Sequence, residues 1–199
     1  MSEHDAWLID LDGTLYHASP VKLMMAAELA LSGWTALRTL RAFRREHERL
    51  REDPDDAAGS PFARQLERTA RGLGLPIEQV EARVETWMIR RPGKWIRLFR
   101  RGSLLDEIAA FKARGGRTAL VSDYPARVKL AALGATELFE VVIASGEELG
   151  PQRLKPAPDG YLAAARELHV EPARCLVIGD RADADGLAAE HAGMAFRHV

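Results

Sequence analysis

Five short apolar runs, each about as long as one buried strand, constrain the fold of this chain more than any other feature. Stretches with helical spacing of apolar residues separate the later runs, such as 104–111, which Gly115 and Gly116 close, and 161–168. Such alternation is typical of a parallel sheet with helices on both faces. We therefore predict an α/β fold with a parallel sheet. The runs are AWLID (6–10), TALVS (118–122), EVVIAS (140–145), CLVIGD (175–180) and, more weakly, MAFRHV (194–199).

A segment of a different kind separates the first run from the second. From about residue 17 to residue 103 we find only helical periodicity, which predicts an all-helical cap inserted after the first strand. The sheet domain would then comprise residues 1–16 plus 104–199, and the cap residues 17–103. Within the cap we expect one or two long helices over 20–50 and further helices near 62–72 and 77–90, with breaks at 52–61 and 90–94.

Composition excludes several classes of protein. The net charge of −1 offers no argument for a nucleic-acid or membrane partner, and 47% hydrophobic residues is ordinary for a globular chain. One cysteine, Cys175, rules out an internal disulfide framework and favours a reducing cytoplasm. No apolar run approaches the roughly 18 residues that span a bilayer, and the first residues do not resemble a signal peptide. We therefore expect a cytoplasmic enzyme, whose oligomeric state stays open.

Charge divides along the same boundary as the periodicity. Residues 17–103 hold 17 Lys and Arg against 11 Asp and Glu, whereas the remainder holds 11 against 18. One interpretation is that the arginines of the first long cap stretch form the solvated side of a helix. The other is that a basic lid faces an acidic floor and attracts an anionic substrate. The arginines are Arg38, Arg41, Arg44, Arg45 and Arg49.

Polar side chains with complementary chemistry follow several of the predicted strands. Asp10 and Asp12, two residues apart, follow the first strand, and Ser122 ends the second. Lys155 precedes a proline-rich helix start, and Asp180 and Asp185 follow a later strand. Open parallel sheets bind ligands at the carboxyl ends of their strands. Carboxylates for Mg²⁺, a nucleophile, a hydroxyl and a cation are together what metal-assisted phosphoryl transfer needs.

The order DLDGT, Ser122, Lys155 and GDRADAD resembles the four motifs of the haloacid dehalogenase superfamily, and the similarity spans residues 6 to about 195. It implies that superfamily's Rossmann-like sheet core, and the helical insert resembles its C1-type cap. The phosphatase branch uses Mg²⁺ and acts on phosphomonoesters. The resemblance therefore implies a phosphatase whose partner is a small phosphorylated metabolite.

The resemblance also implies a role for each matching residue. Asp10 would attack phosphorus and form a phosphoaspartyl enzyme, and Asp12 would protonate the leaving oxygen and then activate water. Ser122 would hydrogen-bond the phosphoryl group, and Lys155 would neutralise it together with Asp10. The Mg²⁺ ligands would be Asp10, the backbone carbonyl of Asp12, Asp180 and, through water or a neighbour, Asp185, for which Asp183 is a competitor.

Residues for substrate recognition are less clearly marked. Tyr16 and His17 follow the first motif and could touch substrate or merely pack the hinge, while Arg97 and Arg100 lie where the cap returns to the core. The other histidines, among them His47, lack metal-ligand spacing, and solvated helix faces suffice for them.

Three other functions stay open. A 2-haloacid dehalogenase of the same superfamily also uses an aspartate nucleophile, but that branch lacks an acid two residues later and needs no metal, so Asp12 and Asp180 argue against it. A sugar phosphomutase and a non-catalytic regulator that binds a phosphometabolite are the further alternatives.

Overall fold

The computed structural model describes residues 4–31, 34–52 and 59–199. Its centre is a parallel sheet of β1 (Ala6–Ile9), β2 (Arg117–Ser122), β3 (Val141–Ala144), β4 (Cys175–Gly179) and β5 (Ala195–His198), in the order β3-β2-β1-β4-β5. Each strand coincides with a predicted run, so the α/β prediction is confirmed. Because β1 is central, its carboxyl end lies between those of β2 and β4, and the motifs that follow these strands meet there.

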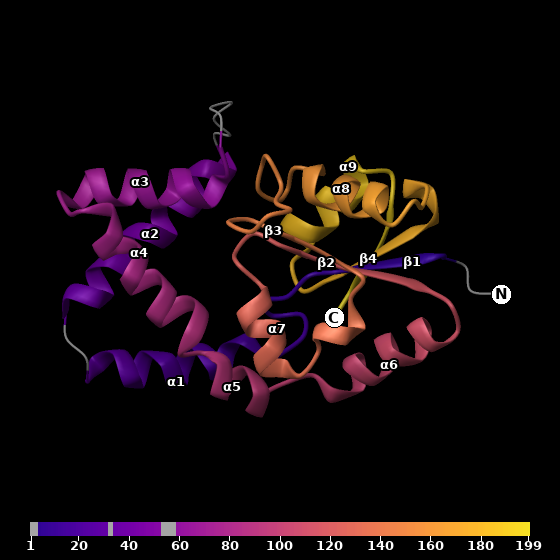
Figure 1. Cartoon of the computed structure of the whole chain (residues 1–199), viewed down its shortest axis with the longest axis horizontal. Coiled ribbons are helices and arrows are strands. Elements are labelled where there is room, and N and C mark those ends of the chain that lie inside the picture. Colours follow the sequence, from indigo (N-terminus) through magenta and orange to yellow (C-terminus); the bar gives the residue numbers. More distant parts are fainter. Residues whose placement is uncertain (1–3, 32–33, 53–58) are drawn as a thin grey trace.

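Helices cover both faces of this sheet (Figure 1). On one face lie α6 (Gly102–Ala113) and α7 (Arg127–Leu133), and on the other lie α8 (Asp159–Glu167) and α9 (Leu187–His191). Side chains of β1 alternate between the two cores: Trp7 and Ile9 pack with α6 and α7, whereas Ala6 and Leu8 pack with α8 and α9. The sequence periodicity predicted α6 and α8 but missed the short α7 and α9.

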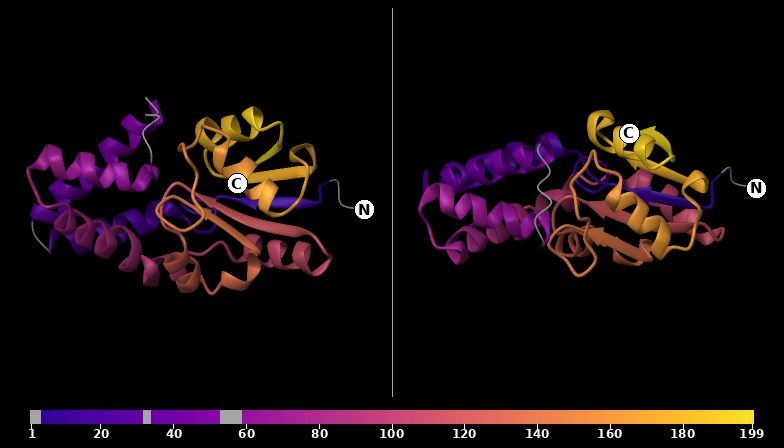
Figure 2. Two further views of the ribbon diagram at one scale, coloured as in Figure 1. Left: turned by 45° about the horizontal axis from the view of Figure 1, so that its top comes forward. Right: turned by 90° about the horizontal axis from the view of Figure 1, so that it is seen from above.

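The described elements between β1 and α6 are helices, apart from an isolated bridge. They are α1 (Ala18–Ala30), α2 (Trp34–Glu52), α3 (Pro61–Leu73), α4 (Ile77–Val84), a π-helical turn (Glu85–Arg90) and α5 (Gly93–Leu98). The helices α1 to α4 lie beyond the carboxyl ends of the strands, to one side of the sheet (Figure 2). Together with the π-helical turn, they form a hydrophobic cluster that includes Phe43, Leu66, Val84 and Trp87. Most of the break predicted at 52–61, residues 53–58, lies outside the described residues.

The two chain segments that join these helices to the sheet domain run side by side. Tyr16 and Arg100 form an isolated antiparallel bridge. The amide of His17 donates to the carbonyl of Phe99 (2.9 Å), and the amide of Arg101 donates to the carbonyl of Leu15 (2.8 Å). The chain therefore leaves and re-enters the sheet domain at a single place. No helix in the described part of the chain is both long and apolar enough to span a bilayer.

Candidate active site

Asp10 lies directly beyond β1, where its backbone amide still hydrogen-bonds the carbonyl of Ile178 on β4. Its side chain is buried. One carboxylate oxygen, Oδ1, lies 2.5 Å from Nζ of Lys155, and the other, Oδ2, accepts a hydrogen bond of 2.9 Å from Thr14 Oγ1. The Asp10 carboxylate is thus held from two sides in a fixed orientation.

Lys155 is buried among acceptors from three segments of the chain. Besides Asp10, its Nζ lies 2.8 Å from Asp185 Oδ1 and donates to the carbonyl of Val121 (3.0 Å). Burial alone would lower the pKa of Lys155, but the carboxylates of Asp10 and Asp185 raise it well above the usual value. Lys155 is therefore a permanent positive charge beside the candidate nucleophile.

Three carboxylates from two segments, one after β1 and one after β4, converge at the same point. Asp10, Asp180 and Asp185 each present an oxygen, and these oxygens lie within 4.8 Å of one another. Burial, and after it the Asp185 carboxylate, raises the pKa of Asp180, as expected where like charges crowd together. A hard divalent cation suits such a set of oxygen ligands.

The backbone around this cluster leaves no room for larger residues. Gly13 has a φ of +104°, and a Cβ there would lie 2.1 Å from Oδ2 of Asp180. A Cβ on Gly179 would lie 2.4 Å from Oδ2 of Asp185. Both positions require glycine because the carboxylates pack directly on the main chain.

Asp185 is the acid of the GDRADAD segment that joins the cluster. It follows β4 on a π-helical turn, Ala182–Gly186, and is buried. Its carboxylate accepts hydrogen bonds from Tyr161 Oη (2.8 Å) and from the amide of Arg181 (3.3 Å). Asp183, by contrast, is exposed and paired with the Arg181 guanidinium at 2.6 Å. The geometry thus favours Asp185 over Asp183.

Asp12 is half-buried and faces a second lysine. Nζ of Lys129, on α7, lies 2.7 Å from both carboxylate oxygens, and Tyr16 donates its hydroxyl to Oδ1. Burial would raise the pKa of Asp12, but the Lys129 ammonium and the Tyr16 hydroxyl hold it below its usual value. The sequence analysis did not single out Lys129. Its position in the mostly apolar segment after Ser122, which forms α7, could have indicated that it faces the site.

Ser122 ends β2 and is buried, and its Oγ accepts a hydrogen bond of 3.2 Å from the amide of Tyr124. Between them, Asp123 accepts a hydrogen bond of 3.2 Å from the amide of Lys155. The loop after β2 is therefore tied to the segment that carries the buried lysine.

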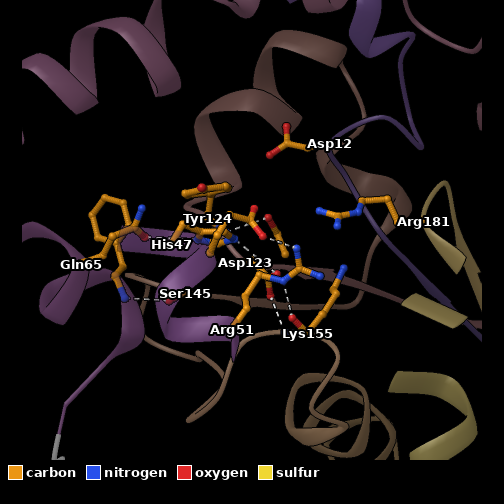
Figure 3. A network of polar contacts seen from close by, with 12 residues as sticks. Asp12, His47, Arg51, Gln65, Asp123, Tyr124, Ser145, Lys155 and Arg181 are labelled. Atoms are coloured by element: carbon orange, nitrogen blue, oxygen red, sulfur yellow. Dashed lines mark hydrogen bonds and ion pairs between the residues drawn. The ribbon is translucent and has the colours of Figure 1, made fainter. Parts of the chain in front are cut away.

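Helices α2 and α3 reach this region from the other side (Figure 3). Nε of Arg51 donates to the carbonyl of Lys155 (2.7 Å), and Nε2 of His47 lies 3.9 Å from Asp123 Oδ2. The His47 ring also stacks on Tyr124 at 4.5 Å, and its Nδ1 lies 3.3 Å from Gln65 Oε1. His47 is 5% exposed, so the expectation of a solvated histidine was wrong. Its neighbours Leu40 and Leu50 on the apolar face of α2 were the available signal.

A cavity of about 500 Å³ lies between these helices and the strand ends. Asp12 and Asp180 line it from the sheet domain, and Arg41, Arg44 and His47 line it from α2. An apolar part of the wall comes mainly from α1, α2 and the segment near residues 87–92, through Ala18, Val21, Met25, Ala26, Leu29, Leu37, Leu40, Trp87, Met88 and Pro92. A cavity of this size and mixed character is typical of small-molecule sites.

The four residues expected to touch substrate lie in different places. Tyr16 lines the cavity through its contact with Asp12, whereas His17 is exposed and is not part of the lining. Arg97 and Arg100 are exposed and line a separate depression of about 440 Å³ with Lys94 and Leu98. The structure therefore brings Tyr16 to the site and leaves the other three outside its wall.

Comparison with known proteins identifies a family. The sequence model of one protein family, the haloacid dehalogenase-like hydrolases, matches residues 4–193 of this chain. Over 66 residues the chain is 42% identical to the glyceraldehyde 3-phosphate phosphatase of Methanopyrus kandleri. That match spans 33% of this chain and only 27% of the length of that relative.

Solved structures share the fold over nearly the whole chain. An L-2-haloacid dehalogenase from Xanthobacter autotrophicus is 18% identical, with a TM-score of 0.68 over 98% of this chain and 77% of the other. A β-phosphoglucomutase from Clostridium difficile is 18% identical, with a TM-score of 0.63 over 97% and 83%. A HAD phosphatase from Thermococcus onnurineus is 18% identical, with a TM-score of 0.56 over 98% and 86%. At such identities the likeness establishes the fold.

Proposed function

Because this chain belongs to the haloacid dehalogenase-like hydrolases, we propose that it is a Mg²⁺-dependent phosphatase that hydrolyses a small phosphomonoester through a phosphoaspartyl intermediate. The observation that most supports this proposal is the position of the Asp10 carboxylate. It lies 2.5 Å from the Lys155 ammonium and close to the carboxylates of Asp180 and Asp185. A nucleophile, a fixed cation and a set of hard ligands within one small volume match the requirements of phosphoryl transfer.

The carboxylate cluster fits the proposed metal. Asp10, Asp180 and Asp185 offer only oxygen atoms, which Mg²⁺ prefers, and they lie close enough together to share one ion. These three side chains and the backbone carbonyl of Asp12 would hold it. When bound, Mg²⁺ would neutralise charge on the phosphoryl group and lessen its repulsion of the Asp10 carboxylate.

The protein's own residues supply the chemical steps of the proposal. A carboxylate oxygen of Asp10 bonds to phosphorus as the ester P–O bond breaks, and Asp12, which takes up a proton when the anionic substrate binds beside it, gives that proton to the leaving alkoxide. Asp12 then removes a proton from the water that attacks the phosphoaspartyl phosphorus, which restores Asp10 and releases phosphate. Lys155 neutralises Asp10 and the transferred group, Ser122 hydrogen-bonds that group, and Lys129 with Tyr16 fixes Asp12 at the cavity wall.

A similar protein supports the proposed substrate class. The name of the Methanopyrus kandleri relative, a glyceraldehyde 3-phosphate phosphatase, supports a phosphate ester of a small metabolite. Cys175, the single cysteine, is buried and free, in keeping with the cytoplasm as the proposed compartment.

Hydrolysis of p-nitrophenyl phosphate with Mg²⁺ and with EDTA tests the proposal. We expect turnover that requires the metal and falls by on the order of 10³-fold or more in Asp10→Asn, since the nucleophile is lost. Asp183→Asn makes the same chemical change at an exposed carboxylate outside the cluster and should keep full activity. Metal-independent turnover, or full activity of Asp10→Asn, would contradict the proposal. Halide release from a 2-haloacid without metal would indicate the dehalogenase instead.

A further inference from the structure

The cavity wall supplied by α1 and α2 carries positive charge that the proposed reaction does not use. Lys22 on α1 and Arg41 and Arg44 on α2 line the cavity that also contains Asp12 and Asp180. All three cations are exposed, so their charged groups can meet a ligand that enters the cavity.

These cations differ from the others at the cavity in their pairing. Lys129 is paired with Asp12, and Arg181 is paired with Asp183. Within residues 4–31, 34–52 and 59–199, no carboxylate forms an ion pair with Lys22, Arg41 or Arg44. The phosphoryl group itself would be neutralised by Lys155 and the metal, beside Asp180 of the cavity wall. The cavity wall supplied by α1 and α2 therefore holds more cationic groups than a phosphomonoester with a single anionic group requires.

The position of these arginines on α2 sets the spacing of a second binding point. The residues of α2 that line the cavity recur at helical intervals and form one face: Leu37, Leu40, Arg41, Arg44, His47 and Glu48. Arg51, farther along the helix, contacts the carbonyl of Lys155. With a rise of about 1.5 Å per residue, Arg44 lies about 10 Å and Arg41 about 15 Å before Arg51 along the axis. Apolar side chains line the same cavity, among them Leu37 and Leu40 on the same face of α2.

We propose that the substrate carries a second anionic group, a carboxylate or a phosphate, which Arg41 and Arg44 bind while the first phosphate lies at Asp10. This inference rests on the proposed phosphatase function and specifies its substrate class. A largely aliphatic segment joins the two anionic groups and packs on Leu40 and Met88. Arginine suits this task because its guanidinium binds carboxylate and phosphate with two parallel hydrogen bonds.

Binding of non-hydrolysable probes tests the inference independently of catalysis. Calorimetry in Mg²⁺ compares pentane-1,5-bisphosphonate, 6-phosphonohexanoate and pentylphosphonate, which share an aliphatic phosphonate and differ in the second anion. The variants are Arg41→Gln/Arg44→Gln and, as a matched control, Arg38→Gln/Arg45→Gln. The control arginines lie on the same helix and are also exposed, but they do not line the cavity. Both variants lose two positive charges, so long-range attraction falls equally in the two.

We expect the parent protein and the control to bind at least one of the two-anion probes about tenfold or more tightly than pentylphosphonate, as charge-assisted hydrogen bonds allow. In Arg41→Gln/Arg44→Gln the ratio of two-anion to one-anion affinity should fall toward one, with the affinity for pentylphosphonate equal to that of the Arg38→Gln/Arg45→Gln control. Which probe shows the larger ratio identifies the second group as phosphate or carboxylate. Equal affinities in the parent protein, or a ratio that survives in Arg41→Gln/Arg44→Gln, would overturn the inference. Loss of p-nitrophenyl phosphatase activity concerns only the proposed function, so the two failures are distinguishable.

Discussion

At the carboxyl ends of the strands three carboxylates are paired with buried lysines, whereas the arginines of α2 that face the same cavity are exposed and form no ion pair in the described part of the chain. Asp10 and Asp185 contact Lys155, and Asp12 contacts Lys129, all at 2.5–2.8 Å. Arg41 and Arg44 have no comparable partner among the described residues. A buried network is costly to alter, because removal of one member leaves another charge unpaired. Under the proposed function, the residues that carry the reaction thus belong to a buried network of the sheet domain, whereas those proposed to select the substrate are exposed on α2.

The largest effect should follow Lys155→Met, which leaves Asp10 and Asp185 buried together without their cation. We expect a loss of activity on the order of 10³-fold and a loss of about 3–5 kcal/mol in the free energy of unfolding. Denaturant unfolding and p-nitrophenyl phosphate turnover measure the two. Asp185→Asn in the same chain removes one stranded carboxylate and should restore part of the stability but none of the activity. Unchanged stability of Lys155→Met would show that the network is less tightly coupled than its distances indicate.

The next largest effect should follow Gly13→Ala. The added Cβ would lie 2.1 Å from Oδ2 of Asp180, so this carboxylate must move, and we expect the Mg²⁺ concentration for half-maximal activity to rise about tenfold or more. Gly115→Ala is the control, since Gly115 has a φ of +86° but no atom within 4 Å of an added Cβ. It should cost stability, about 1 kcal/mol or more, and leave the Mg²⁺ requirement unchanged. A raised requirement in both variants would assign the effect to backbone strain alone.

A more selective effect should follow Lys129→Met, because Lys129 contacts Asp12 and, under the proposed function, acts on the reaction only through it. Proton donation matters most for poor leaving groups, so we expect kcat to fall about 10- to 100-fold on an alkyl phosphate and clearly less on p-nitrophenyl phosphate. Tyr16→Phe removes the other hydrogen bond to Asp12 and should act in the same direction with smaller size. An equal loss on both esters would contradict the positioning role.

The smallest effect should follow Arg51→Gln, at the junction of the two regions. Loss of the hydrogen bond to the carbonyl of Lys155 should lower kcat/KM about two- to tenfold, in line with about 1 kcal/mol for one hydrogen bond. Arg49→Gln on the same helix removes the ion pair of the exposed Arg49 with the buried Glu46, which lies apart from the Lys155 segment, and should leave kcat/KM unchanged. Identical kinetics of the two variants would indicate that α2 and the Lys155 segment act independently.

The sequence predicted the strand-end residues because their positions depend on local signals. Asp10, Ser122 and Asp180 each follow or end an apolar run, and a parallel sheet brings such ends to one edge. Lys129, His47 and Arg51 could not be found in this way, since their places depend on which helix face turns toward the cavity. For the same reason the sequence could not show that Arg41 and Arg44 line the cavity while Arg38 and Arg45 do not. It also could not show that Arg97 and Arg100 line a separate depression.

The paired hydrogen bonds at His17–Phe99 and Leu15–Arg101 have a consequence for protein engineering. The chain enters and leaves the intervening helices through two segments that run side by side. These helices can therefore be exchanged as a unit by rejoining the chain at only two positions, one in each segment. A chimaera that takes these helices from a relative would keep the nucleophile, the buried lysine and the carboxylate cluster on the original sheet domain. Substrate preference could then be altered by recombination at this junction, with the reaction chemistry inherited intact.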